Sequence, residues 1–151
     1  MKEEVNRHLV PNEILLGEVK KLIAEGHHVV IKVKGSSMLP FIVGGRDSVS
    51  LVQPADLKVG DIVLAEIKEG NFVLHRIKAI NGSMVTLMGD GNLCGKERCS
   101  RENVAGKVEM IIRKGKNVNP CSCTEKFKVN LWLMMLPLRR WLLALYRRMP
   151  E

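Results

Sequence analysis

The hydrophobic positions of the chain follow a helical spacing at first and a strand-like spacing afterwards. Between Asn12, a typical helix-starting residue, and Gly26, a typical helix-ending residue, apolar side chains recur every three or four positions. They are Leu15, Val19, Leu22 and Ile23. From residue 28, apolar and polar residues alternate up to Gly35. The pattern predicts a short amphipathic helix within residues 1–27 and β-structure after it.

The segment 28–113 consists of short apolar runs separated by glycine-containing turns. Strands are expected at 28–34, 47–52, 61–67, 71–80, 83–88 and 104–113. Lys68-Glu69-Gly70 and Asn81-Gly82 are turn sequences, so the strands that they connect should pair as hairpins. Many short strands with glycine turns predict a mainly β domain over this segment.

Two further segments complete the predicted organisation. Residues 114–125 are rich in turn-forming residues and are expected to be a linker. Residues 126–151 form a basic, apolar, tryptophan-containing tail, in which Pro137 should break a helix. Arg139-Arg140 interrupts the apolar run, so neither half reaches the roughly 20 residues that span a bilayer.

The tail is predicted to be an amphipathic helical element, and the residues leave three roles open for it. Apolar and tryptophan side chains with interspersed arginines are typical of segments that lie on a membrane surface, here over residues 127–149. The same side chains could instead pack on the β domain or form a homodimer interface. A third role is the binding of a partner protein or a substrate leader.

Composition favours an ordinary globular chain and disfavours a nucleic-acid partner. The chain has 151 residues, of which 46% are hydrophobic and 26% are charged, and its net charge is +8. Residues 126–151 contain six basic residues and one acidic residue, so 6 − 1 = +5 of this excess lies in the tail. Aromatic residues amount to only 4%, which argues against a base-stacking surface.

The sequence predicts a cytoplasmic protein without a metal or other cofactor. Residues 1–12 are polar and lack the apolar core of an export signal, so we expect a cytoplasmic location, with or without contact to the inner face of the membrane. The four cysteines fall as Cys94-x4-Cys99 and Cys121-x-Cys123, which is not the usual spacing of structural zinc sites. They are expected to be free thiols in loops.

Three residues at the edges of apolar runs have the chemistry of a nucleophile, a base and an orienting acid. They are Ser37, His75 and Asp90. A serine hydroxyl is a weak nucleophile unless a neighbouring base accepts its proton. Histidine can do this near neutral pH, and a carboxylate can fix its tautomer.

The motifs around these residues resemble those of the type I signal peptidase and LexA-like serine peptidase superfamily. The similarity covers roughly residues 29–108 and rests on four motifs: Gly35-Ser36-Ser37-Met38-Leu39-Pro40, Gly60-Asp61-Ile62-Val63, His75-Arg76-Ile77 and Gly89-Asp90-Gly91-Asn92. The common bacterial signal peptidases and LexA-like proteins use a lysine base. Because this chain has His75 at that position, it resembles the archaeal and endoplasmic-reticulum branch, which pairs serine with histidine.

The resemblance implies a β-ribbon catalytic domain and a role for each matched residue. Ser37 would be the nucleophile, His75 the general base, and Asp90 the acid that orients the histidine or stabilises its charge. Glu97, in the loosely matching segment beyond Asp90, is the alternative third member. The backbone amide of Ser37 would stabilise the oxyanion. The remaining matched residues would complete the oxyanion hole (Ser36 or Gly35) or shape the substrate groove (Met38 and Pro40).

The expected function is a serine endopeptidase that cleaves an extended segment of a precursor peptide or protein, as a signal or leader peptidase does. Relatives that process secreted proteins carry a transmembrane helix before the serine motif, whereas the helix predicted after Asn12 is too charged to span a membrane. The substrate would then be a cytosolic precursor. Two alternatives are a non-catalytic peptide-binding module and a LexA-like regulator that cleaves its own chain.

Overall fold

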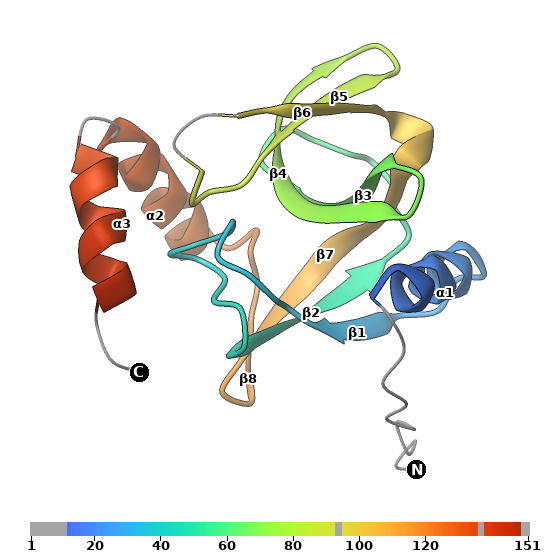
Figure 1. Cartoon of the computed structure of the whole chain (residues 1–151), viewed down its shortest axis with the longest axis horizontal. Coiled ribbons are helices and arrows are strands. Elements are labelled where there is room, and N and C mark those ends of the chain that lie inside the picture. The colour runs from blue at the N-terminus through green and yellow to red at the C-terminus, as the bar shows by residue number, and fades with distance from the viewer. Residues whose placement is uncertain (1–11, 93–94, 136–137, 149–151) are drawn as a thin grey trace.

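The computed structural model describes residues 12–92, 95–135 and 138–148, and its architecture is mainly β (Figure 1). The mainly β prediction is therefore confirmed. In chain order the elements are α1 (Asn12–Ala24), β1 (Val29–Lys32), β2 (Asp47–Val52), β3 (Ile62–Lys68), β4 (Asn71–Asn81), β5 (Met84–Met88), β6 (Glu97–Ser100), the 3-10 turn η1 (Arg101–Asn103), β7 (Val104–Arg113), β8 (Lys116–Val118), α2 (Cys123–Met134) and α3 (Arg139–Arg148).

One antiparallel sheet contains all the strands. Its order is β1-β2-β7-β3-β4-β5-β6, and β8 pairs with the end of β7. The predicted hairpins β3–β4 and β4–β5 are present, with Val63 opposite His75 and Arg76 opposite Met88. The sheet curls so strongly that β6, the last strand of this order, returns to β3 (Figure 1). The motifs of the serine peptidase resemblance are thereby gathered near one end of the curled part.

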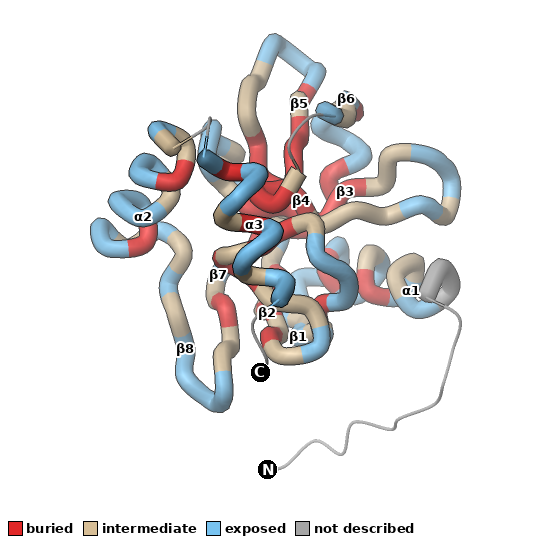
Figure 2. Tube along the Cα trace, turned by 60° about the vertical axis from the view of Figure 1, so that its left-hand side comes forward, coloured by how far each residue is buried: buried red, intermediate tan, exposed pale blue. Residues whose placement is uncertain are grey.

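The sheet separates two hydrophobic cores, because successive strand residues point to opposite faces. The first core lies beneath α1 and includes Val19, Ile23, Met38, Ile42, Val49, Leu51, Ile62, Leu64, Ala105, Val108 and Ile111. The second fills the curl and includes Val63, Ala65, Ile77, Val85, Leu87, Cys99 and Val104. The buried positions concentrate in the strands, as Figure 2 shows.

The helix α1 has the predicted extent but a slightly different packed face. Val19 and Ile23 are buried in the first core, whereas Leu15 and Leu22 are 44% and 41% exposed. Leu16 packs against the core in their place, so the buried stripe is rotated relative to the prediction. Ile23 lies against Gly106, where a Cβ atom would be 2.8 Å from its Cδ1 atom. The absence of a side chain at Gly106 therefore lets the helix approach the sheet closely.

Two strands, β6 and β8, are additions to the predicted set. In β6 only Cys99 is buried, and the other residues are polar, so the strand has little hydrophobic alternation. Cys99 therefore lies in a core strand and not in a loop, and burial, together with the charge of Glu97, raises the pKa of its thiol. The strand β8 lies inside the segment 114–125 that was expected to be a linker. A tight turn at Lys114 and Gly115, both with positive φ, folds it back onto β7.

The tail forms two helices, α2 and α3, that pack on the β domain. Ser122 caps α2 by accepting a hydrogen bond from the Glu125 amide. Pro137, expected to break the helix, lies outside the described residues between the two helices. Trp132 and Leu143 form a third core with Leu39 and Phe41 of the loop after β1. Within the described ranges, no helix has the length and apolar character needed to cross a membrane.

Candidate active site

Ser37 lies in the loop of residues 33–46, here called the serine loop, which connects β1 to β2. The loop is closed at its base by a hydrogen bond from the Gly45 amide to the Val33 carbonyl, at 2.9 Å. Gly44 passes so close to Gly35 that a Cβ atom would lie 2.1 Å from the Gly35 carbonyl oxygen. Met38, which was expected to shape the substrate groove, is only 2% exposed and belongs to the first core. It anchors the loop from beneath.

A buried carboxylate fixes the end of the serine loop. Asp47 is fully buried and accepts hydrogen bonds from the Val43 amide at 2.9 Å and from Arg46 Nε at 2.7 Å. Burial alone would raise the pKa of Asp47, but the hydrogen bonds and the charges of Arg46 and Arg113 hold it below its ordinary value. Arg113 also donates to the Phe41 carbonyl. These bonds restrict the movement of the segment that carries the serine.

The turn of residues 89–92, here called the Asp90 turn, touches the backbone of Ser37. The Gly91 amide donates to the Ser37 carbonyl oxygen at 2.8 Å, and a Cβ atom on Gly89 would lie 2.3 Å from that oxygen. Glycine is therefore required for this approach. The pairing of β4 with β5 ends at this side of the sheet with Arg76 opposite Met88. His75 precedes Arg76 on β4, and Gly89 follows Met88 at the end of β5. Because Gly89 lies against the Ser37 carbonyl, Ser37 and His75 are brought to the same end of the β4–β5 ladder.

His75 is buried and contacts Glu97 on β6. Its Nδ1 atom lies 2.5 Å from Glu97 Oε2, and the residue is 4% exposed. An ionised carboxylate can only accept a hydrogen bond, so this contact places the proton on Nδ1 and leaves the lone pair on Nε2. A histidine in this tautomer has the form that a general base requires.

Asp90 has a different partner from the one expected. Its carboxylate oxygens accept hydrogen bonds from Arg76 Nε at 2.8 Å and Arg76 Nη2 at 2.7 Å, and the residue is 1% exposed. Arg76 and His75 are successive residues of β4 and point to opposite faces of the strand. The expected contact between Asp90 and His75 is therefore not formed in the described part of the chain, and Glu97 contacts His75 instead.

The C-terminal helices hold the Asp90 turn from the other side. The Asp90 carbonyl oxygen accepts hydrogen bonds from Trp132 Nε1 at 3.0 Å and from Arg139 Nη2 at 2.7 Å. Phe41 packs edge-on against Trp132, and the Arg76 and Arg139 guanidinium groups lie over Phe41 and Trp132 respectively. Nothing in the tail sequence alone indicated these contacts, because they depend on tertiary packing.

The Ser37 hydroxyl and two neighbouring backbone amides are unpaired within the described residues. Ser37 is partly exposed, and its hydroxyl makes no hydrogen bond with any described residue. Within the same described ranges, the Ser36 and Ser37 amides have no acceptor, as an oxyanion hole would require. Gly35 is exposed, and Pro40 lines a cavity of about 290 Å³ with Phe41 and Trp132.

Lys78 of β4 lies half-buried at the irregularity between β4 and β5. Burial lowers the pKa of its ammonium group, as do the charges of Arg76 and Arg139, while Asp90 opposes the shift. A lysine in such surroundings is the alternative base to test against His75.

Comparison with known proteins identifies a family for most of the chain. The chain matches the family model for Peptidase S24-like proteins over residues 3–111. No curated protein matches it. The matched range includes Ser37, His75 and Glu97 and ends before β8, α2 and α3. Since the match covers 111 − 2 = 109 of the 151 residues, the chain belongs to the Peptidase S24-like family of serine peptidases.

Proposed function

We propose that the protein is a serine endopeptidase in which Ser37 is the nucleophile, His75 the general base and Glu97 the acid that orients the base. The observation that carries the proposal is the 2.5 Å contact between Glu97 and His75 Nδ1. It would select the tautomer whose Nε2 accepts a proton. The Ser37 hydroxyl and the Ser36 and Ser37 amides, which are unpaired within the described residues, support the same reading. Membership of a serine peptidase family supports the same chemistry.

The reaction follows from these groups. His75 Nε2 takes the proton from the Ser37 hydroxyl as Oγ attacks the scissile carbonyl carbon, and the carbonyl oxygen becomes an oxyanion. The Ser37 amide, helped by the Ser36 amide, donates hydrogen bonds to that oxyanion. The intermediate collapses, the C–N bond breaks, and the imidazolium returns its proton to the departing amine. Water then attacks the acyl-enzyme with His75 again acting as base, which releases the acid product and restores Ser37.

The substrate is proposed to be an extended segment of a precursor, such as a leader peptide. Within the described residues, β1 pairs with β2 alone and leads directly into the serine loop. An extended peptide can add to such an edge as a further strand, through main-chain hydrogen bonds. The polypeptide would then run past Ser37, as cleavage by a signal or leader peptidase requires. Self-cleavage of a second copy of the chain would use the same groups and is distinguished by the following test.

A serine-reactive fluorophosphonate probe tests the proposal. We expect the wild-type protein to be labelled and the Ser37→Ala variant to remain unlabelled, because only Ser37 has an activated hydroxyl. Ser36→Ala is the matched control and should still be labelled. If both variants are labelled, or if no protein is labelled, the result would contradict the proposed peptidase. It would favour a peptide-binding module instead. Cleavage products of the chain itself, absent in Ser37→Ala, would identify self-cleavage.

The pH dependence of cleavage distinguishes a histidine base from a lysine base. With His75 as the base, the rate should rise with pH and then level off, because only the neutral ring accepts a proton. Lys78→Met should then change kcat by less than about threefold, because the Lys78 ammonium group would take no part in the reaction. A rate that still climbs above about pH 8 and disappears in Lys78→Met would assign the base to Lys78.

A further inference from the structure

The outer sides of α2 and α3 concentrate exposed apolar side chains. Of the eleven exposed large hydrophobic residues among those described, six lie in or beside these two helices: Phe127, Leu131, Met134, Leu138, Trp141 and Leu145. Trp141 is 77% exposed and Met134 is 81% exposed. Side chains of this size are normally covered when they occur together.

These residues form stripes and not scattered contacts. In α2 the exposed apolar residues follow a spacing of four and three. A spacing of three and four relates Leu138, directly before α3, to Trp141 and Leu145 within it. In each helix the side that faces the β domain is distinct from the exposed stripe. Trp132 of α2 and Leu143 of α3 are buried on that packed side. Each helix is therefore apolar on its packed side and again on part of its outer side.

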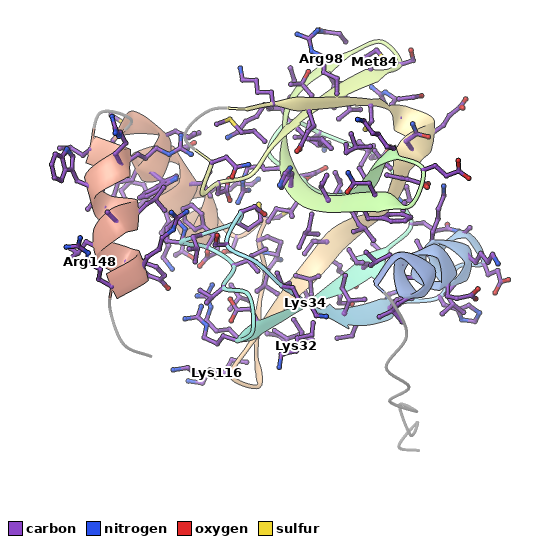
Figure 3. All side chains as sticks on the ribbon, viewed as in Figure 1. Lys32, Lys34, Met84, Arg98, Lys116 and Arg148 are labelled. Carbon is purple, nitrogen blue, oxygen red and sulfur yellow. The ribbon has the colours of Figure 1, made fainter. Side chains whose placement is uncertain are left out.

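The charges beside the stripes are almost all positive. Lys126, Arg140, Arg147 and Arg148 are exposed. The acidic residue within α2 and α3, Glu125, is buried and hydrogen-bonded to Lys128 at 2.8 Å. Figure 3 shows Arg148 projecting from the side of α3 that lies away from the sheet. Arginine and lysine side chains beside apolar and tryptophan side chains suit the boundary between lipid headgroups and acyl chains.

We propose that the outer surface of α2 and α3 binds the surface of a bilayer that contains anionic phospholipids. The apolar stripes would enter the headgroup region while the arginines meet the lipid phosphates. A second copy of the chain is a poorer occupant, because a twofold contact would place this cationic face against itself. Since Trp132 and Arg139 contact the Asp90 turn on the packed side, the bound protein would hold its serine loop near the membrane.

Vesicle binding tests the proposal independently of peptidase activity, because the Ser37→Ala protein can be used throughout. In co-sedimentation, we expect affinity for vesicles containing about one quarter phosphatidylglycerol to exceed that for pure phosphatidylcholine by at least tenfold, and to fall with added salt. Tryptophan emission should shift to shorter wavelength on binding. The shift would come from Trp141, since Trp132 is already buried, and Trp141→Phe should abolish it.

Two variants and a matched control identify the surface. Trp141→Ser combined with Leu145→Ser should reduce the affinity at least tenfold, and Arg147→Glu combined with Arg148→Glu should do the same without altering the core. Met84→Ser combined with Val59→Ser, which removes exposed apolar side chains elsewhere, should leave binding unchanged. Absence of vesicle binding, or binding that none of the tail variants weakens, would overturn the proposal. So would a dimer that Trp141→Ser dissociates and that has no affinity for vesicles, because it would assign the surface to a second copy.

Discussion

Replacing Ser37 by alanine is expected to lower kcat for peptide cleavage by about 10⁴- to 10⁶-fold, because the attacking oxygen is removed from an otherwise intact site. The serine loop should keep its structure, since its anchors are Met38, Asp47 and Gly44 and not the Ser37 hydroxyl. The measurement is the initial rate on a peptide substrate together with the circular dichroism spectrum of the variant.

The neighbouring serine provides the matched control for this experiment. Ser36→Ala keeps the backbone amide and should lower kcat by less than about tenfold. His75→Ala should be as damaging as Ser37→Ala, and the double variant should be no worse than either, because residues that act as a unit give non-additive losses. Equal losses in Ser36→Ala and Ser37→Ala would contradict the assignment of the nucleophile.

Replacing Glu97 by glutamine is expected to lower kcat by about 10³- to 10⁴-fold. The amide group can turn its NH₂ toward His75 Nδ1, which stabilises the tautomer that has no lone pair on Nε2. Glu97 is partly exposed, with a side-chain relative accessibility of 36%, so its loss should change the free energy of unfolding by no more than about 1–2 kcal/mol. Rates and urea denaturation of the same preparation measure the two effects separately.

Asp90→Asn is the comparison variant, and its main effect should fall on stability. It breaks a pair in which both side chains are at most 6% exposed, and leaves the Arg76 charge buried without its carboxylate. The expected loss is about 3–5 kcal/mol of unfolding free energy. If instead Asp90→Asn folds normally and loses kcat, while Glu97→Gln keeps it, the orienting acid is Asp90.

Hydrophobic alternation predicted most of the sheet, because β2, β4, β5 and β7 each have at least one face in a core. The same rule could not find β6, whose four residues include one buried side chain. This strand carries Glu97, so the sequence left the choice between Asp90 and Glu97 open. Which carboxylate contacts His75 depends on the face of β4 that each carboxylate approaches. The ion pair of Asp90 with Arg76 holds Asp90 on the face opposite to His75.

The tail shows a second limit of sequence reading. Its helices follow from composition, and Pro137 lies at the interruption between them. The contact of Trp132 and Arg139 with the Asp90 carbonyl is a long-range one, between residues more than forty positions apart. The local sequence pattern does not indicate which distant residues come into contact. These contacts are stabilised by the packing of the third core and by the need of two buried donors for an acceptor.

The two donors to the Asp90 carbonyl also impose an order on biosynthesis. Trp132 and Arg139 follow the whole family-matched region, so a ribosome produces Ser37, His75 and Glu97 well before the residues that brace the turn touching Ser37. The contacts that brace the Asp90 turn can therefore form only after the segment that carries Ser37 has been synthesised.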